Sequence, residues 1–194
     1  MAYRETLQIG DPLLKASNTK VINFDDSKIK RVIQDLIDTM RKNDLAGLAA
    51  PQIGENYKIF VTEPRVTQFR TIDQADKLRF YINPTITNYS TEKCVTYEGC
   101  GSVLNAMLFG PVKRPKQITI EAYNETGKKF QLRCDGLLSR VIQHEYDHLY
   151  GIEFTEKIFD YGKLLAREFY IQNIKNSPAQ LTNTKIHTKE FKWL

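Results

Sequence analysis

The stretch Gln143-His-Glu-Tyr-Asp-His148 constrains this chain more than any other, and it lies in an expected helix from Asp135 to Gly151. A helix turns by about 100° per residue, so His144 and His148 share one face with apolar residues. Asp135 is the expected N-cap, and Gly151 is expected to end the helix. Polar residues take the opposite face and are expected to be exposed: Ser139, Gln143, Tyr146, Asp147 and Tyr150.

Two histidines four residues apart project from successive helical turns in the same direction, so His144 and His148 can both bind one metal ion. Glu145 lies between them, close enough to act on a water bound to that metal. Histidines on an apolar helix face are also common as ordinary core residues, so the motif alone leaves both interpretations open. The functional interpretation is a hydrolytic metal site.

A hydrolytic metal site commonly uses three protein ligands and leaves one position for water. A third histidine six residues after His148 is not available, because that position holds Phe. Cys100 lies between two glycines, which leaves room for a metal to approach its sulfur, and this setting favours it. Glu168 is the alternative, although its charged neighbours suggest a solvated surface residue. The other two cysteines, Cys94 and Cys134, are expected to be buried thiols.

The length of 194 residues, with 41% hydrophobic residues, suffices for one domain with a core of its own. The net charge of +5 permits contact with an anionic surface without requiring it, and direct DNA binding is not expected. No apolar run reaches the roughly 20 residues of a membrane span, and the first residues lack an apolar signal core. We expect a soluble cytoplasmic protein, and three cysteines suit a reducing compartment.

The segment Asp44–Gly54 is rich in small residues and leads into a strand-like run, Tyr57–Val61. One interpretation is a loop whose backbone pairs with an extended ligand while the Gln52 amide points inward. The other is a tight turn before a buried strand, which composition alone favours.

The remaining pattern predicts helices, strands and one exposed loop. An amphipathic helix is expected from Asp25 or Ser27 to Lys42, and an exposed loop or hairpin tip from Glu63 to Lys77. Strands are expected over 80–86, 91–97, 118–123 and 129–133, and the tail 191–194 alternates like a short strand. A second helix is expected from about Asp160 to Lys175, with Leu164, Leu165, Phe169 and Ile174 as its inner residues.

Three segments, in this order and spacing, resemble the signature motifs of peptide deformylases: Gly47-Leu-Ala-Ala-Pro-Gln52, Glu98-Gly-Cys-Gly-Ser102 and Gln143-His-Glu-Tyr-Asp-His148. The resemblance covers roughly residues 5–157, and its start near the N-terminus leaves no room for an organelle transit peptide, which favours a bacterial-type cytoplasmic enzyme. It implies an α+β fold in one catalytic domain over 1–194. Antiparallel strands would surround the His helix, with the first helix outside and the weakly matched segment 158–194 docked against the body.

The resemblance implies that Cys100, His144 and His148 bind a divalent metal, typically Fe²⁺, which Zn²⁺, Ni²⁺ or Co²⁺ can replace. The implied reaction is hydrolysis of N-formyl-methionyl nascent peptides to formate and a free amino terminus, with a metal-bound water as nucleophile. Glu145 would act as general base on that water and then as the acid for the leaving amine.

The same resemblance assigns oxyanion stabilisation to the Gln52 side chain and the Gly101 backbone N–H. The Ala46-Gly47 backbone would pair with the extended peptide, and Leu137 and Arg140 would also contact substrate.

This chain departs from the family pattern at several positions. Leu45 stands where the first motif usually has Gly, Gly101 where Leu usually follows the metal cysteine, and Leu104 where Pro is usual. Arg140 occupies a position that is generally apolar and lines the methionine pocket. Its stem can pack while its charge reaches solvent, or it can alter the preference for the first residue of the substrate.

Two alternatives remain beside the deformylase interpretation. A zinc metallopeptidase would use His144, His148 and Glu168. A non-catalytic binding module would need a closed structural zinc site, for which no fourth ligand is evident. Basic residues in the C-terminal region suggest contact with the ribosome: Lys157, Lys163, Arg167 and Lys175.

Overall fold

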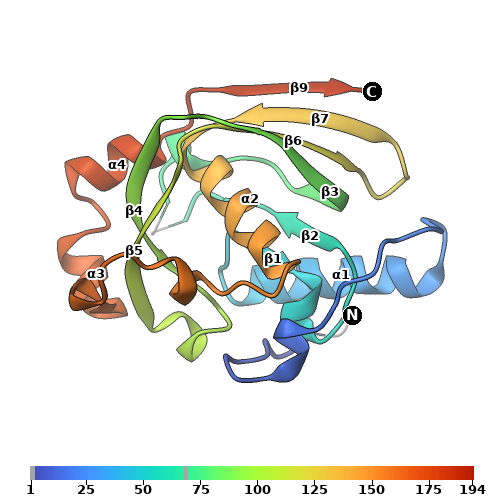
Figure 1. The fold of residues 1–194 in the computed structure, drawn as a ribbon, viewed down its shortest axis with the longest axis horizontal. Coiled ribbons are helices and arrows are strands. Elements are labelled where there is room, and N and C mark those ends of the chain that lie inside the picture. Colours follow the sequence, from blue (N-terminus) through green and yellow to red (C-terminus); the bar gives the residue numbers. More distant parts are fainter. Residues whose placement is uncertain (1–2, 68–69) are drawn as a thin grey trace.

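The chain forms four α-helices and two antiparallel sheets in a computed structural model that describes residues 3–67 and 70–194 (Figure 1). The helices are α1 (Ser27–Lys42), α2 (Gly136–His148), α3 (Arg167–Asn173) and α4 (Pro178–Thr184). The larger sheet has the order β1 (Gly47–Ala49), β2 (Ile59–Thr62), β3 (Arg79–Tyr89), β6 (Ile118–Tyr123), β7 (Lys129–Cys134) and β9 (Lys189–Trp193). The smaller sheet has the order β4 (Lys93–Gly99), β5 (Leu108–Pro115) and β8 (Leu165–Ala166). The expected α+β class is confirmed.

The core lies on both faces of the larger sheet, because successive side chains of a strand point to opposite sides. On β2, Ile59 and Val61 pack with the apolar face of α1, whereas Phe60 faces the layer that contains Leu138 of α2. The helix α1 begins as predicted, with the Asp26 carboxylate accepting a hydrogen bond from the Lys28 N–H. Figure 1 shows α2 running through the middle of the fold, between the two sheets.

The central position of α2 overturns part of its predicted orientation. Ser139 and Gln143, expected on an exposed face, are buried, and the Gln143 amide donates to the Pro115 carbonyl. Asp135 does occupy the N-cap position, but its carboxylate accepts hydrogen bonds from the backbone N–H groups of His187 and Thr188. The helix is enclosed on more than one side, so its polar residues bond to protein groups in place of water.

The C-terminal segment differs most from expectation. The helix predicted over 160–175 is replaced by a 3-10 turn, the short strand β8 and the seven-residue helix α3. Phe169, predicted as an inner residue, is 55% exposed. Pairing of β8 with β5 joins Ala166 to Leu108, and this tertiary contact overrides the local helical spacing. The helix α4 was not predicted, whereas the predicted terminal strand is confirmed as β9, paired with β7.

The segment 63–77 was predicted as an exposed loop, and the prediction is wrong for part of it. Gln74 and Asp76 are buried, and the Gln74 amide donates to the Thr184 hydroxyl of α4. Asp76 accepts hydrogen bonds from Arg79 of β3 and Lys189 of β9, so this carboxylate ties the tail to the sheet. Within the described ranges, no helix is both long and apolar enough to cross a bilayer.

The Asp76 cluster makes stability depend on pH. Burial alone raises the pKa of Asp76, but the hydrogen bonds from Arg79 and Lys189 outweigh it and hold the pKa below its ordinary value. A carboxyl group with a depressed folded-state pKa stabilises the fold above its unfolded pKa, and that contribution is lost as pH falls through the folded pKa. We expect Asp76→Asn to lower the free energy of unfolding by about 2 kcal/mol at pH 7. Urea unfolding at pH 7 and below about pH 4 tests this, because the difference from the unmodified protein should shrink at the lower pH.

Candidate metal centre

Three potential metal ligands converge from two elements. Cys100 follows the end of β4, and His144 and His148 project from successive turns of α2. One ligand atom from each of the three lies within 4.8 Å of the other two, and Cys100 Sγ is 3.3 Å from His148 Nε2. All three residues are buried. The structure therefore brings together the set favoured from sequence, whereas Glu168 is exposed on α3 and outside this cluster.

The donor set fits a single divalent transition metal. A thiolate and two imidazoles are ligands that Fe²⁺ or Zn²⁺ accepts, and three ligands leave a coordination position open for chemistry. His144 Nδ1 lies 3.0 Å from a Glu98 carboxylate oxygen, which leaves Nε2 of that ring as its ligand atom. A carboxylate behind a ligating histidine fixes the ring's orientation and tautomer.

Glu98 is the centre of a buried ion-pair network that sequence analysis missed. Its carboxylate accepts hydrogen bonds from Arg114 at 2.7 Å and from Arg140 at 2.9 Å, and Arg114 also pairs with Asp147 at 2.6 Å. Burial alone raises the pKa of Glu98, but the charges of Arg114 and Arg140 and the hydrogen bond with His144 hold it well below the ordinary value. Glu98 is therefore an anion that supports a metal ligand. Its place two residues before Cys100 was the only sequence signal.

Arg140 does not place its charge in solvent, so the predicted snorkelling is wrong. Its side chain is 7% exposed, and its guanidinium donates to Glu98 and to the carbonyls of Val112 and Cys94. Five fixed N–H donors suit such a site, where carbonyl and carboxylate oxygens meet from several directions. Arg140 thus joins α2 to β4 and β5 of the smaller sheet. It also lines the cavity beside the metal ligands.

Glu145 lies against β1 in a water-poor setting. It is 4% exposed, and among the described residues its Oε2 has no hydrogen-bond partner. Burial raises the pKa of Glu145 to about 7. A carboxyl group with a pKa near neutral is suited to both take up and release a proton.

Gly47 allows the backbone of β1 to approach this carboxylate closely. A Cβ at position 47 would lie 2.7 Å from a methyl carbon of Val141 and 2.8 Å from Glu145 Cγ. Both distances are shorter than carbon–carbon van der Waals contact. No other side chain fits here without moving α2 or the Glu145 carboxylate.

We expect Gly47→Ala to lower kcat/KM for the reaction at this site by about 100-fold, because a displacement of about 1 Å in a catalytic group can cost that much. Steady-state rates measured with the metal-loaded variant test this. Gly10→Ala serves as a control for glycine loss away from the site: an added Cβ there has no neighbour within 4 Å, although φ at Gly10 is +103°, unlike at Gly47. Equal rates for the Gly47 variant and the unmodified protein would contradict the packing argument.

Gln52 is oriented toward Cys100. Its side-chain oxygen accepts a hydrogen bond from the Ala49 N–H at 2.8 Å, which turns the amide nitrogen inward. That nitrogen lies 3.2 Å from Ser102 Oγ and 3.4 Å from Cys100 Sγ. The inward orientation predicted for this amide is thus present. It places an N–H donor beside the metal ligands.

Two departures from the family pattern contact each other. A Cβ at Gly101 would lie 3.1 Å from Leu45 Cδ1, so the Leu45 side chain occupies the space that a side chain at 101 would need. The Gly101 carbonyl accepts hydrogen bonds from the side chains of Thr6 and Gln8, which hold this peptide in place. Compared with the family pattern, the large residue is at position 45 and the glycine at position 101. Because the two positions are neighbours in space, the local volume stays filled.

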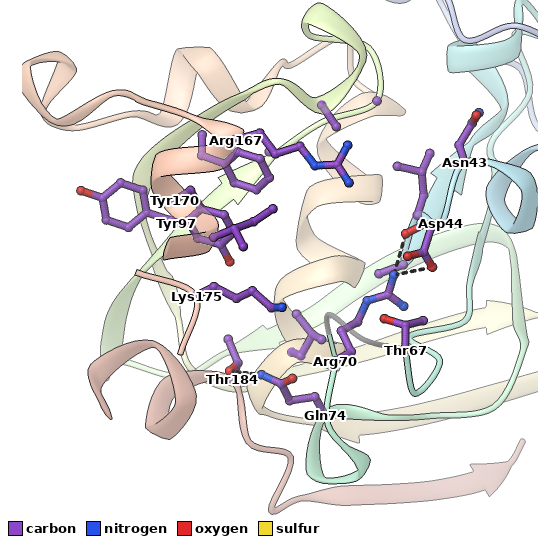
Figure 2. Close-up of a pocket in the computed structure, with 18 of the residues that line it drawn as sticks. Asn43, Asp44, Thr67, Arg70, Gln74, Tyr97, Arg167, Tyr170, Lys175 and Thr184 are labelled. Carbon is purple, nitrogen blue, oxygen red and sulfur yellow. Dashed lines mark hydrogen bonds and ion pairs between the residues drawn. The ribbon is translucent and has the colours of Figure 1, made fainter. Parts of the chain in front are cut away.

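A cavity of about 990 Å³ opens next to the metal ligands (Figure 2). Gly99 and Gly101, on either side of Cys100, line it, and so do Ala46, Leu137 and Arg140 of the predicted substrate-binding residues; Gly47 is not among the lining residues. Figure 2 shows the opposite wall, which the C-terminal segment supplies through Arg167, Tyr170 and Lys175. Two of the basic residues predicted to contact the ribosome, Arg167 and Lys175, thus line this cavity.

Two sheet edges border the same region. The strand β1 is the edge of the larger sheet and β4 the edge of the smaller one. On β4, the side chain of Gln180 from α4 bonds to both the N–H and the carbonyl of Tyr97, so it covers that part of the edge. Stacking of Tyr170 on Phe109, with ring centroids 4.1 Å apart, fixes α3 against β5. The backbone N–H and carbonyl of Tyr97 are therefore already paired and are not open to an added strand.

Comparison with known proteins gives a consistent result. A family model described as polypeptide deformylase matches residues 3–163. A peptide deformylase of Dictyoglomus thermophilum is 40% identical over 154 residues, which cover 79% of this chain and 92% of that protein. The chloroplastic peptide deformylase 1B of Solanum lycopersicum is 34% identical over 188 residues, 94% of this chain but 63% of that longer protein. A class I type b peptide deformylase of Acinetobacter baumannii with bound Met-Ala-Ser superimposes with a TM-score of 0.74 at 25% identity, covering 81% of this chain and 99% of that one.

Proposed function

The chain belongs to the peptide deformylase family, and we propose that it hydrolyses the formyl group from N-formyl-methionyl peptides of newly made proteins, releasing formate. The observation that carries this function is the buried cluster of Cys100, His144 and His148 with Glu145 beside it. The cluster lies at a cavity bordered by two sheet edges, where a peptide can enter in extended form.

Cys100, His144 and His148 would hold one divalent ion, and we propose Fe²⁺ as the native metal, with Zn²⁺, Ni²⁺ or Co²⁺ able to replace it. When bound, the ion supplies Lewis-acid chemistry that activates a water molecule for attack on the formyl carbon. The thiolate is compatible with each of these metals, and it makes an iron-loaded protein sensitive to oxygen.

Glu145 would move the proton in this reaction. Its Oε2 is available to take a proton from the attacking water, and a carboxyl group with a pKa of about 7 can pass that proton to the leaving amine. The close backbone of Gly47 holds the carboxylate at the cluster.

Gln52 and the backbone N–H of Gly101 would stabilise the negative charge that develops on the formyl oxygen. The Gln52 amide nitrogen supports this role through its distance of 3.4 Å from Cys100 Sγ and its fixed orientation. Gly101 directly follows Cys100, and the side chains of Thr6 and Gln8 bond to its carbonyl, in the peptide that follows its own N–H.

The substrate backbone would add along β1 at Ala46 and Gly47, opposite Gly99. Leu137 and Arg140 would line the pocket for its first side chain, with the buried guanidinium acting through its aliphatic stem. A bound Met-Ala-Ser in the Acinetobacter baumannii deformylase supports a short extended peptide as the ligand. The cover that Gln180 forms over Tyr97 limits how far the peptide pairs with β4.

Three further parts of the proposal concern the whole protein. One catalytic domain over 1–194 is supported by β9, which completes the sheet that begins with β1. Ribosome contact would use Lys157 and Lys163, which are exposed outside the cavity. A cytoplasmic location is supported by bacterial relatives, whereas the tomato relative is chloroplastic by name.

Product analysis tests the proposed function. Protein loaded with Fe²⁺ without oxygen is incubated with formyl-Met-Ala-Ser, and mass spectrometry identifies the peptide product. The proposal predicts Met-Ala-Ser and one equivalent of formate. Cleavage between Met and Ala, with the formyl group retained, would instead support the metallopeptidase alternative.

A further inference from the structure

Glu153 is a buried carboxylate that lies directly behind the metal cluster. It follows the end of α2, where Gly151 at φ +67° lets the chain reverse toward the last helical turn. The residue is 1% exposed. Its backbone N–H is held by the Glu156 side chain at 2.8 Å, so its position is fixed at the start of the 3-10 turn Phe154–Lys157.

The carboxylate of Glu153 is unsatisfied in the part of the chain that the structure describes. Neither Oε1 nor Oε2 has a hydrogen-bond partner there. A buried carboxylate without a donor costs several kcal/mol, on the order of a typical domain's spare stability. Such a group is retained in a protein when it serves another purpose.

The imidazole of His148 lies close to the Glu153 carboxylate. Its Oε2 lies 3.9 Å from His148 Nδ1, while His148 Nε2 faces Cys100 Sγ at 3.3 Å. A metal ion bound to Nε2 leaves the proton of the neutral ring on Nδ1, which then needs an acceptor. The N–H that the ligating ring would carry on Nδ1 and the unsatisfied carboxylate of Glu153 therefore face each other.

The other ligating histidine already has this arrangement. His144 Nδ1 lies 3.0 Å from a carboxylate oxygen of Glu98, on the side of the imidazole ring away from Nε2. Glu98 and Glu153 thus stand behind the two histidines in the same way. The difference is distance: the Glu153 contact must shorten by about 1 Å to become a hydrogen bond.

We propose that Glu153 is a positioning residue for the metal, whose carboxylate accepts the Nδ1–H of His148 and holds that ring for coordination through Nε2. The proposal rests on the Cys100–His144–His148 metal site of the proposed function. It predicts two opposite effects of the Glu153 carboxylate on stability. The carboxylate stabilises the metal-loaded protein and destabilises the metal-free one.

Replacement of Glu153 by a similar-sized apolar residue separates these two effects. Co²⁺ is loaded into the unmodified protein and into the variants Glu153→Leu and Glu153→Gln. Loss of Co²⁺ from each protein to excess chelator is then followed by the decrease of the thiolate-to-cobalt absorption band. The Leu variant is expected to lose Co²⁺ about 10 to 100 times faster. The metal-free Leu variant is expected to unfold at a higher temperature than the metal-free unmodified protein, because no carboxylate is buried. Glu190→Gln, which removes an exposed carboxylate that pairs with Arg133 outside the metal cluster, is expected to lose Co²⁺ at the unmodified rate.

Co²⁺ loss from the Leu variant at the unmodified rate would overturn the role of Glu153, and so would a lower unfolding temperature of its metal-free form. If the Leu variant fails to fold, the Gln variant decides. Because glutamine is a neutral acceptor, this variant should release Co²⁺ faster than the unmodified protein, and an equal rate overturns the proposal. Unmodified protein that shows no thiolate-to-cobalt band would contradict the metal site itself, a result distinct from failure of the Glu153 inference alone.

Discussion

Glu145→Gln is expected to lower kcat for formate release by about 10²- to 10⁴-fold, the usual contribution of a positioned general acid or base. Glutamine keeps the size of the side chain but cannot take up the proton of the attacking water. The carboxylate it replaces is buried beside the metal ligands with a pKa of about 7, so its protonation changes near neutral pH. Formate release from formyl-Met-Ala-Ser, measured with equal metal content in both proteins, checks this prediction.

Glu168→Gln is the matched control, because Glu168 is exposed on α3 and lies outside the metal cluster. Its rate should equal that of the unmodified protein. A large loss in this control would favour Glu168 over Cys100 as the third metal ligand, and activity retained in the Glu145 variant would contradict the role of Glu145 as the base.

Cys100→Ser is expected to remove the metal and reduce formate release by more than about 100-fold. Serine has no thiolate to offer, and two histidines alone make a weak and incomplete site. Metal content after gel filtration should fall from one ion per chain toward zero, and activity should fall with it. Elemental analysis and the formate assay on the same sample measure both.

Cys94→Ser is the control, because it makes the same substitution at a cysteine outside the metal cluster. Cys94 Sγ lies 3.3 Å from Arg140 and is not part of the cluster, and a serine hydroxyl can accept the same hydrogen bond. This variant should keep its metal. Full metal content and activity in Cys100→Ser would mean that the third ligand is another residue.

The pairing of His144 and His148 could be predicted from sequence because its geometry is local, whereas the choice of Cys100 over Glu168 also needed the resemblance to peptide deformylases. His144 and His148 are one helical turn apart, and the glycines around Cys100 signal an open approach to its sulfur. Several of the antiparallel strands could be predicted for the same reason, since alternating patterns and turn residues are local features. The hairpin of β6 and β7, which leads into α2, is an example. Other strands, among them β5, were not predicted.

The parts that sequence could not predict depend on residues that are far apart in the chain. Arg140 is read as a surface charge from its own neighbours, and only the fold places Glu98 within 2.9 Å of it. Likewise, β8 forms because β5 offers a partner, which no local pattern of 160–175 reveals. Glu153 was overlooked because its significance comes from the chain reversal at Gly151.

Leu45 and Gly101 show how two departures can be explained together. Each departure alone suggests an altered loop. Taken together they are complementary, because the Leu45 side chain occupies the space that a side chain at position 101 would need. The side chain of Leu45 thus fills the space beside Gly101, next to Cys100.

The most direct test of the account is formate release as a function of metal content. Protein freed of metal with a chelator receives increasing amounts of Fe²⁺ without oxygen, and formate release from formyl-Met-Ala-Ser is measured at each step. The account predicts no activity in the metal-free protein, then a linear rise that reaches its plateau at one ion per chain. Activity that persists without metal, or that is absent at one bound ion per chain, would contradict it.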